Sequence, residues 1–455
     1  MKSKSFILEN FGCQMNVADA TELNQLLKAD GYVESSDETA DVVILNSCAV
    51  RGSAEERIYG RLRHYEALKK KKPFTLILMG CVAQKEGEKV LAKSPHVDMV
   101  VGTHQKSRLP ELLKEHHHSI DDSQQDVSYA NPDHSGQKVF SQLGDYEFTP
   151  PVPSLRYPFK ADVTIIHGCN KYCTYCIVPY TRGIEMSQKS ALIIENVKGL
   201  VDRGVTEISL LGQNVNSYGQ DNGDITFAEL LYELNKVDGL RRIRFLTSHP
   251  KDFTSELIDV IRDSEKVCKY IHLPLQSASD GVLEKMRREY SYEHYRNIIS
   301  ELRLKIPGIA LSTDILVGFP YESEKDYIET LEAMKEIRFD TAYMFKYSIR
   351  EGTESAGYPD IVDETEKIRR LQLIIATQRE ITKEQNEKDL GRVEELLLES
   401  RSKNNPGELL GKTDSNKPVV VALDETMIGG YVPVRLKALK GNTFQGELLP
   451  QAVTG

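Results

Sequence analysis

The sequence has no apolar run that approaches the roughly 20 residues a membrane-spanning helix needs. Its first residues, MKSKSFILENFGCQ, reach polar side chains after three apolar ones, which argues against a cleaved signal peptide. Hydrophobic residues make up 40% of the chain and charged residues 28%, which is the balance of a folded globular protein. We therefore expect a cytoplasmic protein that is not embedded in a membrane.

An excess of positive charge is also missing, since the formal net charge is −10. This balance disfavours indiscriminate binding to nucleic acid but leaves room for local basic patches. The 455 residues exceed what one ordinary core holds, and a prior of roughly 150 residues per domain predicts about three domains.

Cysteine is scarce, and three of the seven cysteines lie within one short stretch, HGCNKYCTYC. In a reducing compartment such thiols favour metal binding or catalysis over disulfides. Cys169, Cys173 and Cys176 have no fourth cysteine beside them, whereas structural zinc takes four ligands. A 4Fe-4S cluster held by three cysteines keeps one iron open to another ligand. The spacing therefore favours an iron–sulfur cluster over zinc.

Three more cysteines follow strand-like runs in the first 115 residues. Cys13, Cys48 and Cys81 end the segments FGC, NSC and MGC, each after an apolar run, and helical segments separate the runs. Alternating strands and helices predict a parallel sheet, whose ligands bind at the carboxyl ends of the strands. We expect a second three-cysteine metal site there, although buried structural cysteines are the alternative. Cys268 lies far from any such end and is predicted to be a buried structural thiol.

The fold class is predicted to be α/β with three units. Residues 1–120 form the N-terminal parallel-sheet domain, 121–154 a linker, 155–387 a core, and 388–455 a small antiparallel β-barrel. Between residues 160 and 350, six strand-like runs alternate with helical segments, which predicts a partial (β/α)6 barrel. Polar residues end these runs and predict a lined cavity. Among them are Gln213, Asn214, Ser248, Gln276 and Asp314.

The segment CNKYCTYC matches CxxxCxΦC, with Tyr175 at the aromatic position, and so resembles the radical S-adenosylmethionine (SAM) superfamily. Further segments narrow the resemblance to the methylthiotransferase family, and the C-terminal barrel resembles the RNA-binding TRAM domain. These segments are FGCQMN, NSCAVR, GCVAQ, CIVPYTRG, LLGQNVNSYG, LPLQS, LVGFP and YSIREGT. GCQMN resembles the branch that acts on isopentenylated adenosine beside the tRNA anticodon. The resemblance covers nearly the whole chain.

The resemblance implies two 4Fe-4S clusters and two molecules of SAM. Cys169, Cys173 and Cys176 would hold the cluster that generates a radical from SAM, and Cys13, Cys48 and Cys81 an auxiliary cluster involved in sulfur transfer. The auxiliary cysteines and Glu185 are predicted to take part in catalysis. The predicted SAM contacts are Tyr175, Gln213, Asn214, Ser248, Gln276 and Asp314.

The expected partners are the tRNA anticodon stem-loop carrying isopentenylated adenosine and an electron donor such as flavodoxin or ferredoxin, and a monomer suffices. Predicted phosphate contacts come from basic residues of the first domain and of the small barrel. They are Arg57, Arg61, Arg63, Lys69 to Lys72, Arg401, Lys412, Lys417 and Arg435.

One position departs from the family pattern, because Gln188 stands where RGxExSR has arginine. A neutral amide cannot reproduce the charge and forked donors of arginine. Two alternatives stay open. One is a methylthiotransferase for another tRNA base or for a ribosomal protein, and the other is a metal-containing RNA-binding protein without catalysis.

Overall fold

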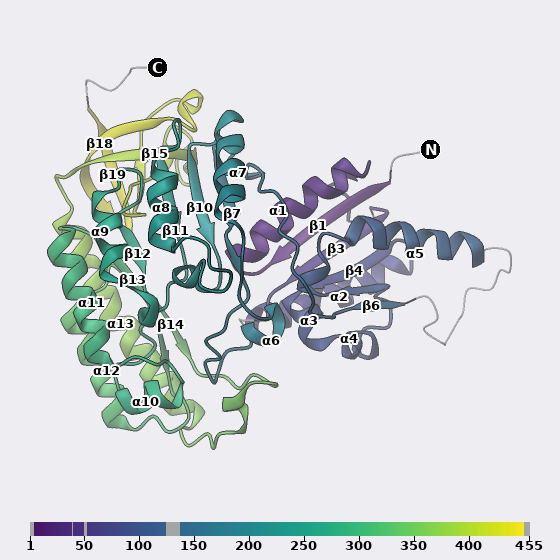
Figure 1. Cartoon of the computed structure of the whole chain (residues 1–455), viewed down its shortest axis with the longest axis horizontal. Helices are drawn as coiled ribbons and strands as arrows, with labels where there is room; N and C mark the ends of the chain where they lie inside the picture. The colour runs from purple at the N-terminus through teal and green to yellow at the C-terminus, as the bar shows by residue number, and fades with distance from the viewer. Residues whose placement is uncertain (1–3, 39, 50–51, 124–136, 450–455) are drawn as a thin grey trace.

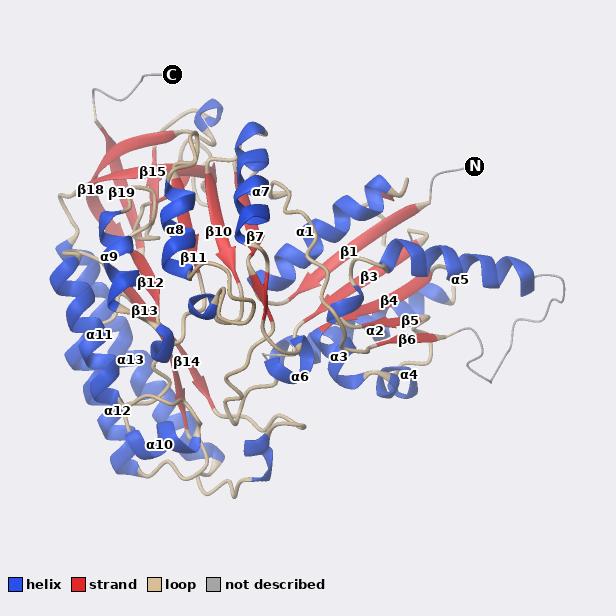
Figure 2. Cartoon of the chain, in the orientation of Figure 1, coloured by secondary structure: helices blue, strands red, loops and turns tan. Residues whose placement is uncertain are grey.

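The computed structural model describes residues 4–38, 40–49, 52–123 and 137–449 (Figure 1). It contains the three expected kinds of unit: a parallel sheet with helices, a strand and helix core, and a small closed barrel (Figure 2). The barrel and the N-terminal sheet contact different parts of the core, so the core lies between them (Figure 1).

The N-terminal unit is a six-stranded parallel sheet in the order β2-β1-β3-β4-β5-β6. Its strands are β1 (Ser5–Phe11), β2 (Val33–Glu34), β3 (Val42–Ser47), β4 (Thr75–Gly80), β5 (Met99–Val101) and β6 (Lys138–Phe140). Its helices are α1 (Gln14–Ala29), α2 (Gly52–Lys69), α3 (Cys81–Glu86), α4 (Glu88–Lys93) and α5 (Leu109–Ser123). The strands predicted before Cys13, Cys48 and Cys81 are confirmed as β1, β3 and β4. The edge strand β6 is an addition within the segment predicted to be a linker.

Strands β3 and β4 are buried along their whole length because helices cover both faces of the sheet. Val43 and Leu45 of β3 pack on one face with Ile58 and Leu62 of α2. The intervening residue Ile44 packs on the other face, in the core that includes residues of α1 and α5. Because successive side chains of a strand point to opposite faces, the apolar residues of β3 pack into two hydrophobic cores.

The core consists of two three-stranded parallel sheets, β11-β10-β7 and β12-β13-β14. Among the described residues, the two sheets are joined by a single β-bridge, between Ile243 and Val267. The predicted six-strand partial barrel therefore has a break after its third strand, β11. The strands are β7 (Lys160–Thr164), β10 (Glu207–Leu211), β11 (Arg242–Phe245), β12 (Tyr270–His272), β13 (Ala310–Val317) and β14 (Thr341–Lys346), with a short hairpin of β8 (Ile166–His167) and β9 (Met186–Ser187).

Helices of the core follow its strands along the chain and pack around the sheets (Figure 1). They are α6 (Val178–Arg182), α7 (Ser190–Asp202), α8 (Phe227–Asn235), α9 (Ser255–Asp263), α10 (Asp280–Lys285), α11 (Tyr292–Lys305), α12 (Glu324–Ile337) and α13 (Glu364–Lys388). Side-chain caps fix where some of them begin. Thr226 and Glu229 form a reciprocal capping box at α8, and Ser323 and Asp326 form one at α12.

The C-terminal unit is a closed barrel in the order β15-β16-β17-β19-β18. Its strands are β15 (Val393–Arg401), β16 (Leu409–Lys412), β17 (Pro418–Val421), β18 (Tyr431–Lys440) and β19 (Thr443–Leu448). Alternate side chains such as Leu396, Leu398 and Val434 fill the interior with Phe444. The pairs are antiparallel as predicted, except for the parallel pair β17 and β19.

The barrel is fixed to the core by two buried arginines of β11. Arg244 donates to the backbone carbonyls of Thr413 (2.8 Å) and Asp414 (2.9 Å), and Arg242 donates to that of Lys412 (3.0 Å). Arg242 is the first residue of β11. The barrel therefore covers the amino ends of the core strands and leaves their carboxyl ends to other partners (Figure 1).

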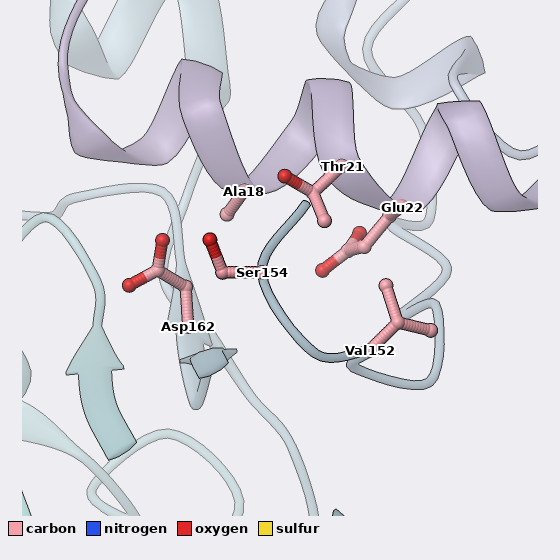
Figure 3. A pocket seen from close by; sticks show the side chains of 6 residues that line it. All are labelled: Ala18, Thr21, Glu22, Val152, Ser154 and Asp162. Carbon is pink, nitrogen blue, oxygen red and sulfur yellow. The ribbon is translucent and has the colours of Figure 1, made fainter. Parts of the chain in front are cut away.

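Helix α1 of the N-terminal unit packs against β7 of the core around a cavity of about 10 Å³, room for one water molecule (Figure 3). Gln14 donates to the carboxylate of Asp162 at 2.6 Å across this contact. Glu22 lines the same cavity. Burial raises the pKa of Asp162 to about 6, against an ordinary value of 3.8. A carboxylate that is costly to ionise thus lies where the two units meet.

This raised pKa predicts a pH-dependent effect of Asp162→Asn. Between pH 4 and pH 6 the Asp162 carboxyl group is ionised in the unfolded chain but still protonated in the folded chain. It therefore lowers the stability of the fold more and more as the pH rises, and by its full amount above pH 6. The amide removes this penalty of about 3 kcal/mol. We expect the variant to melt at a higher temperature than the parent at pH 7.5 and at the same temperature at pH 4.

The matched control is Asp202→Asn, because Asp202 is exposed at the end of α7. It should show no such pH-dependent difference. Thermal melts of the three proteins at both pH values check the prediction, and an equal effect of Asp162→Asn at both would contradict it.

Candidate functional site

The cysteines of the N-terminal unit lie at one edge of its sheet. Cys48 directly follows β3, Cys81 directly follows β4 and begins α3, and Cys13 lies two residues beyond β1. These three strands are neighbours, and the last residue of each pairs with the last residue of the next. The fold therefore brings the three positions to the same edge, which is what the strand-end pattern predicts. We call them the auxiliary triad.

The thiols of the auxiliary triad interact with one another and with an arginine. A hydrogen bond with Cys48 and, more weakly, the charge of Arg182 lower the pKa of Cys13 to about 6, although burial opposes this. Burial raises the pKa of Cys81, and the charge of Arg182 offsets part of that rise. The edge thus combines three neighbouring thiols with a fixed positive charge, which suits thiolate ligands.

Neighbouring residues in the same motifs hold this edge in shape. Gly80 has a φ of +91°, and a Cβ there would lie 2.5 Å from the carbonyl oxygen of Ser47. Asn16 donates to the same carbonyl (2.9 Å), and Asn46 donates to the carbonyl of Asn16 (2.9 Å). Asn16 also accepts a hydrogen bond from the thiol of Cys13 at 3.2 Å. The motifs FGCQMN, NSC and MGC therefore supply the three thiols and also the hydrogen bonds and the close backbone packing that hold them in place.

The second triad, which we call the loop triad, follows the hairpin strand β8. Gly168 has a φ of +81°, and a Cβ there would lie 1.9 Å from the carbonyl oxygen of Ile184, so the loop turns too tightly for any other residue. The backbone amide of Cys169 donates to the carbonyl of Gly183 at 3.0 Å. The amide of Cys176 donates to the carbonyl of Cys173 at 2.9 Å. These bonds fold the loop back on itself.

Two thiols of the loop triad, Cys169 and Cys176, are hard to ionise without a bound cation. Burial, followed by interactions with neighbouring groups that include the other thiols of the loop, raises the pKa of Cys169 and of Cys176 to about 12. Thiolates in such a place need positive charge, which a bound metal cluster supplies. The donor set therefore fits a metal cluster.

Within the described ranges, no three side chains of histidine, cysteine, aspartate or glutamate are arranged around a single metal ion. The cysteines of a 4Fe-4S cluster bind one iron each, so three thiols would hold three irons and leave the fourth open.

Arg182 connects the two triads. It ends α6, six residues after Cys176, yet its buried guanidinium reaches the N-terminal unit and forms an ion pair with Asp19 of α1 at 2.9 Å. Asp19 also binds Lys106 (3.1 Å). The Nη1 of Arg182 has no hydrogen-bond partner among the described residues. Arg182 follows the loop triad in the chain, but its positive charge lies near the auxiliary triad.

Several buried polar atoms at the carboxyl ends of β10 and β11 and beside β9 have no hydrogen-bond partner among the described residues. They are Glu185 Oε1, Gln188 Nε2, Gln213 Nε2, both side-chain polar atoms of Asn216, Ser248 Oγ and His249 Nε2. Leaving one such atom unsatisfied costs about 1–3 kcal/mol. Their concentration next to the loop triad indicates a binding site for a polar molecule.

Of the predicted SAM contacts, Gln213 and Ser248 belong to this group. The Oε1 of Gln213 accepts from the backbone amide of Gly168 in the cluster loop, while its Nε2 is left for a ligand. Asn214 is fully engaged, since it donates to Asp252 (2.6 Å) and accepts from the amide of His249 (3.1 Å). Asn214 therefore links the end of β10 to the residues that follow β11, and its contact with SAM stays a prediction.

The other predicted contacts have different surroundings. Tyr175 packs edge-on against Phe319, with ring centroids 6.2 Å apart. Gln276 has a φ of +72°, which leaves its backbone in the left-handed region at the end of β12. Asp314 lies 3.5 Å from the Nε2 of His272. The contact of each with SAM stays a prediction.

Glu185 and Gln188 are both buried. Burial raises the pKa of the Glu185 carboxyl group, whose Oε1 has no partner among the described residues. Gln188 is held by its backbone, because its amide donates to Ile165 and its carbonyl accepts from the hydroxyl of Tyr218 at 2.7 Å. Its side-chain Nε2 has no hydrogen-bond partner among the described residues.

Sequence reasoning missed Arg182 and Arg288, the two buried arginines that interact with thiols of the two triads. Arg182 lies in CIVPYTRG, where its charge inside an apolar segment was an available signal. Arg288, in MRREY, has an exposed arginine directly before it, and its pattern gives no sign of burial. The prediction for Cys268 is confirmed in that this thiol is buried, beside Arg244 at the contact with the barrel.

Many predicted phosphate contacts are already engaged with acidic groups. Lys417 lies between Asp340 (3.0 Å) and Asp389, and Arg401 pairs with Glu425. Others in ion pairs are Arg61 with Glu9 and Glu38, Lys69 with Asp98, and Lys70 with Glu66. Burial lowers the pKa of Lys412. Arg57, Arg63 and Arg435 remain exposed and are the better candidates.

None of the helices in the described part of the chain has the length and apolar character that a bilayer crossing requires. Three family models match the chain. They are the uncharacterized protein family UPF0004 over residues 5–102, the radical SAM superfamily over residues 163–334 and the TRAM domain over residues 387–449. The matches fall on the three folded units in order.

Solved structures support the fold over most of the chain. The radical S-adenosylmethionine methyltransferase TsrM from Kitasatospora setae, with cobalamin and a [4Fe-4S] cluster bound, has a TM-score of 0.54 at 12% identity over 78% of this chain and 74% of that chain. The cobalamin-dependent radical enzyme OxsB has a TM-score of 0.51 at 13% identity over 81% of this chain and 56% of that one. At such identities the likeness concerns the fold alone.

Relatives along nearly the whole length share one name, tRNA-2-methylthio-N(6)-dimethylallyladenosine synthase. The protein from Thermoanaerobacter pseudethanolicus is 44% identical over 98% of this chain and 93% of the relative. That from Geotalea uraniireducens is 42% identical over 98% and 99%, and that from Clostridium botulinum 42% over 96% and 95%. With its three domains and its two cysteine triads, this chain belongs to the radical SAM methylthiotransferase family, in the branch that bears this name.

Proposed function

We propose that this protein adds a methylthio group to carbon 2 of N(6)-isopentenyladenosine next to the tRNA anticodon. The observation that carries the proposal is the joining of the two thiol triads through Arg182. A protein that only binds RNA has no use for two such triads. Family membership and the match to a TRAM domain support an RNA substrate.

Each triad has a distinct task in this proposal. Cys169, Cys173 and Cys176 would hold the radical cluster, and Cys13, Cys48 and Cys81 would hold a second 4Fe-4S cluster. When bound, the two clusters and SAM supply a carbon-centred radical, the sulfur and the methyl group. The chain's own contribution is to hold these groups at fixed positions and to exclude water.

The group of polar atoms beside the loop triad fits the polar ends of SAM. Gln213 Nε2 and Ser248 Oγ can hydrogen-bond its amino-acid and ribose groups, and Asn214 keeps the two strand ends in register. Glu185 offers a carboxyl group whose pKa burial raises, so it can hold or release a proton beside the radical site. This gives Glu185 a chemical task that a fully exposed carboxylate would not perform.

An adenine must leave the stacked anticodon loop to reach either triad, and aromatic side chains hold such bases. Tyr172 and Tyr180 of the cluster loop are exposed and form an edge-to-face pair at 6.2 Å. Tyr180 and Ile177 also line a cleft of about 260 Å³ between α3, which begins at Cys81, and α6. A base and its apolar isopentenyl chain would enter at this face.

Contacts with the RNA backbone would come from exposed basic residues such as Arg57 and Arg63 of α2 and Arg435 of the barrel. The barrel lies at the amino ends of the core strands and the cluster loop at the carboxyl ends (Figure 1). An RNA that contacts both must therefore run along the core. A flavodoxin or ferredoxin as electron donor, a monomeric state and a cytoplasmic location stay predictions.

The substrate is tested with anticodon stem-loop RNA that carries adenosine or N(6)-isopentenyladenosine. The isopentenyl group has five carbons, each worth about 0.8 kcal/mol when buried, so we expect methylthiolation of the modified RNA to be at least about a hundredfold faster. Mass spectrometry of the nucleosides measures the product. The Cys268→Ala variant is the matched control and should keep activity, because Cys268 lies outside both triads.

Equal rates on the two RNAs would contradict the choice of substrate. Product on a ribosomal protein or on a different tRNA base would instead assign the enzyme to another branch of the family. Absence of any SAM cleavage in the reduced, reconstituted protein would contradict an enzymatic function altogether.

A further inference from the structure

Arg288 lies two residues beyond Met286, the residue that caps α10, and is buried against the loop triad. Its Nη1 donates a hydrogen bond to the sulfur of Cys173 at 3.2 Å. Its Nε donates to the hydroxyl of Tyr290 (3.2 Å), and its Nη2 donates to the carbonyl of Pro274 (3.4 Å). Each nitrogen of the guanidinium group has an acceptor, so the group cannot turn away from the cysteine.

The positive charge of Arg288 has no carboxylate partner among the described residues. Its electrostatic neighbours are the hydroxyls of Tyr290 and Tyr175 and the thiol of Cys173. A buried cation without an anion is strongly unfavourable. The thiolate ligands of a bound cluster are the anions within reach, so the arginine and the loop triad compensate each other.

Arg182 at the auxiliary triad differs in this respect. Asp19 forms an ion pair with it at 2.9 Å, so part of its charge is already neutralised. Arg288 instead applies its full charge to one cysteine of the loop triad. The two triads therefore lie in different electrostatic environments, although each has a buried arginine.

Reduction of a 4Fe-4S cluster adds one electron and therefore one negative charge to the cluster and its thiolates. Hydrogen bonds to the sulfurs and nearby charge set the reduction potential of such clusters. A buried cation with a hydrogen bond to a ligand sulfur stabilises the reduced form, and the low dielectric of the interior strengthens its effect.

We propose that Arg288 is a positioning residue that raises the reduction potential of the radical cluster through its hydrogen bond to Cys173. It lets a weak one-electron donor of the flavodoxin or ferredoxin class reduce the cluster. The inference rests on the cluster of the loop triad and is independent of which RNA base is modified.

The test is a redox titration of the full-length, anaerobically reconstituted protein with dithionite, followed by electron paramagnetic resonance. The signal of the radical cluster is the one that changes when SAM is added, because only a cluster with an open iron beside the SAM site responds. Arg288→Gln should shift its midpoint to a more negative potential by at least about 59 mV, which is a tenfold change in the ratio of reduced to oxidised cluster for one electron.

Arg288→Lys keeps the positive charge but loses the forked hydrogen-bond donors of the guanidinium group. Its midpoint potential should therefore shift less than that of the glutamine variant. The matched control is Arg287→Gln. Arg287 is the preceding residue, but its side chain is exposed and pairs with Glu354 at 2.6 Å. Its loss should leave the midpoint unchanged.

An unchanged midpoint in Arg288→Gln with full iron content would overturn the proposal, since a residue that only supports the fold would give this result. Loss of the cluster in both Arg288 variants would also overturn it, because the arginine would then be needed for assembly. Absence of the SAM-responsive signal in the parent protein would contradict the proposed function instead, so the two failures are distinguishable.

Discussion

The buried ionic network of Arg182, Asp19 and Lys106 fixes how the N-terminal unit meets the core. Arg182 ends α6, the helix that follows the loop triad, and Asp19 lies in α1, the helix that begins directly after Cys13 of the auxiliary triad. Removal of one partner of such a buried network typically costs about 3–5 kcal/mol. The network therefore fixes the distance between the two triads. Clusters that act on the same base need this distance to be constant.

The two triads reach similar chemistry by different routes. The auxiliary triad is assembled by a parallel sheet whose neighbouring strands end in register, so its cysteines can lie far apart in sequence. The loop triad is assembled by a tight turn that Gly168 makes possible. Each has a buried arginine, but only Arg182 shares its charge with a carboxylate. Two clusters with the same ligands can therefore differ in reduction potential.

The strand ends were predictable, because apolar runs with period two and cysteines after them determine which edge the thiols occupy. The partial barrel and the closed C-terminal barrel were predictable for the same reason. The roles of single charged residues were not. Lys417 has the composition of a surface lysine, yet Asp340 and Asp389 hold it inside the contact with the barrel. Such pairs join residues far apart in sequence, and no local pattern reports them.

The central claim is that the chain holds two clusters, one on each triad, and iron analysis tests it most directly. After anaerobic reconstitution the intact protein should contain about eight irons, since each cluster has four. Replacement of Cys169, Cys173 and Cys176 by alanine should lower this to about four, as should replacement of Cys13, Cys48 and Cys81. About four irons in the intact protein, falling to none when the loop triad is removed, would contradict the account.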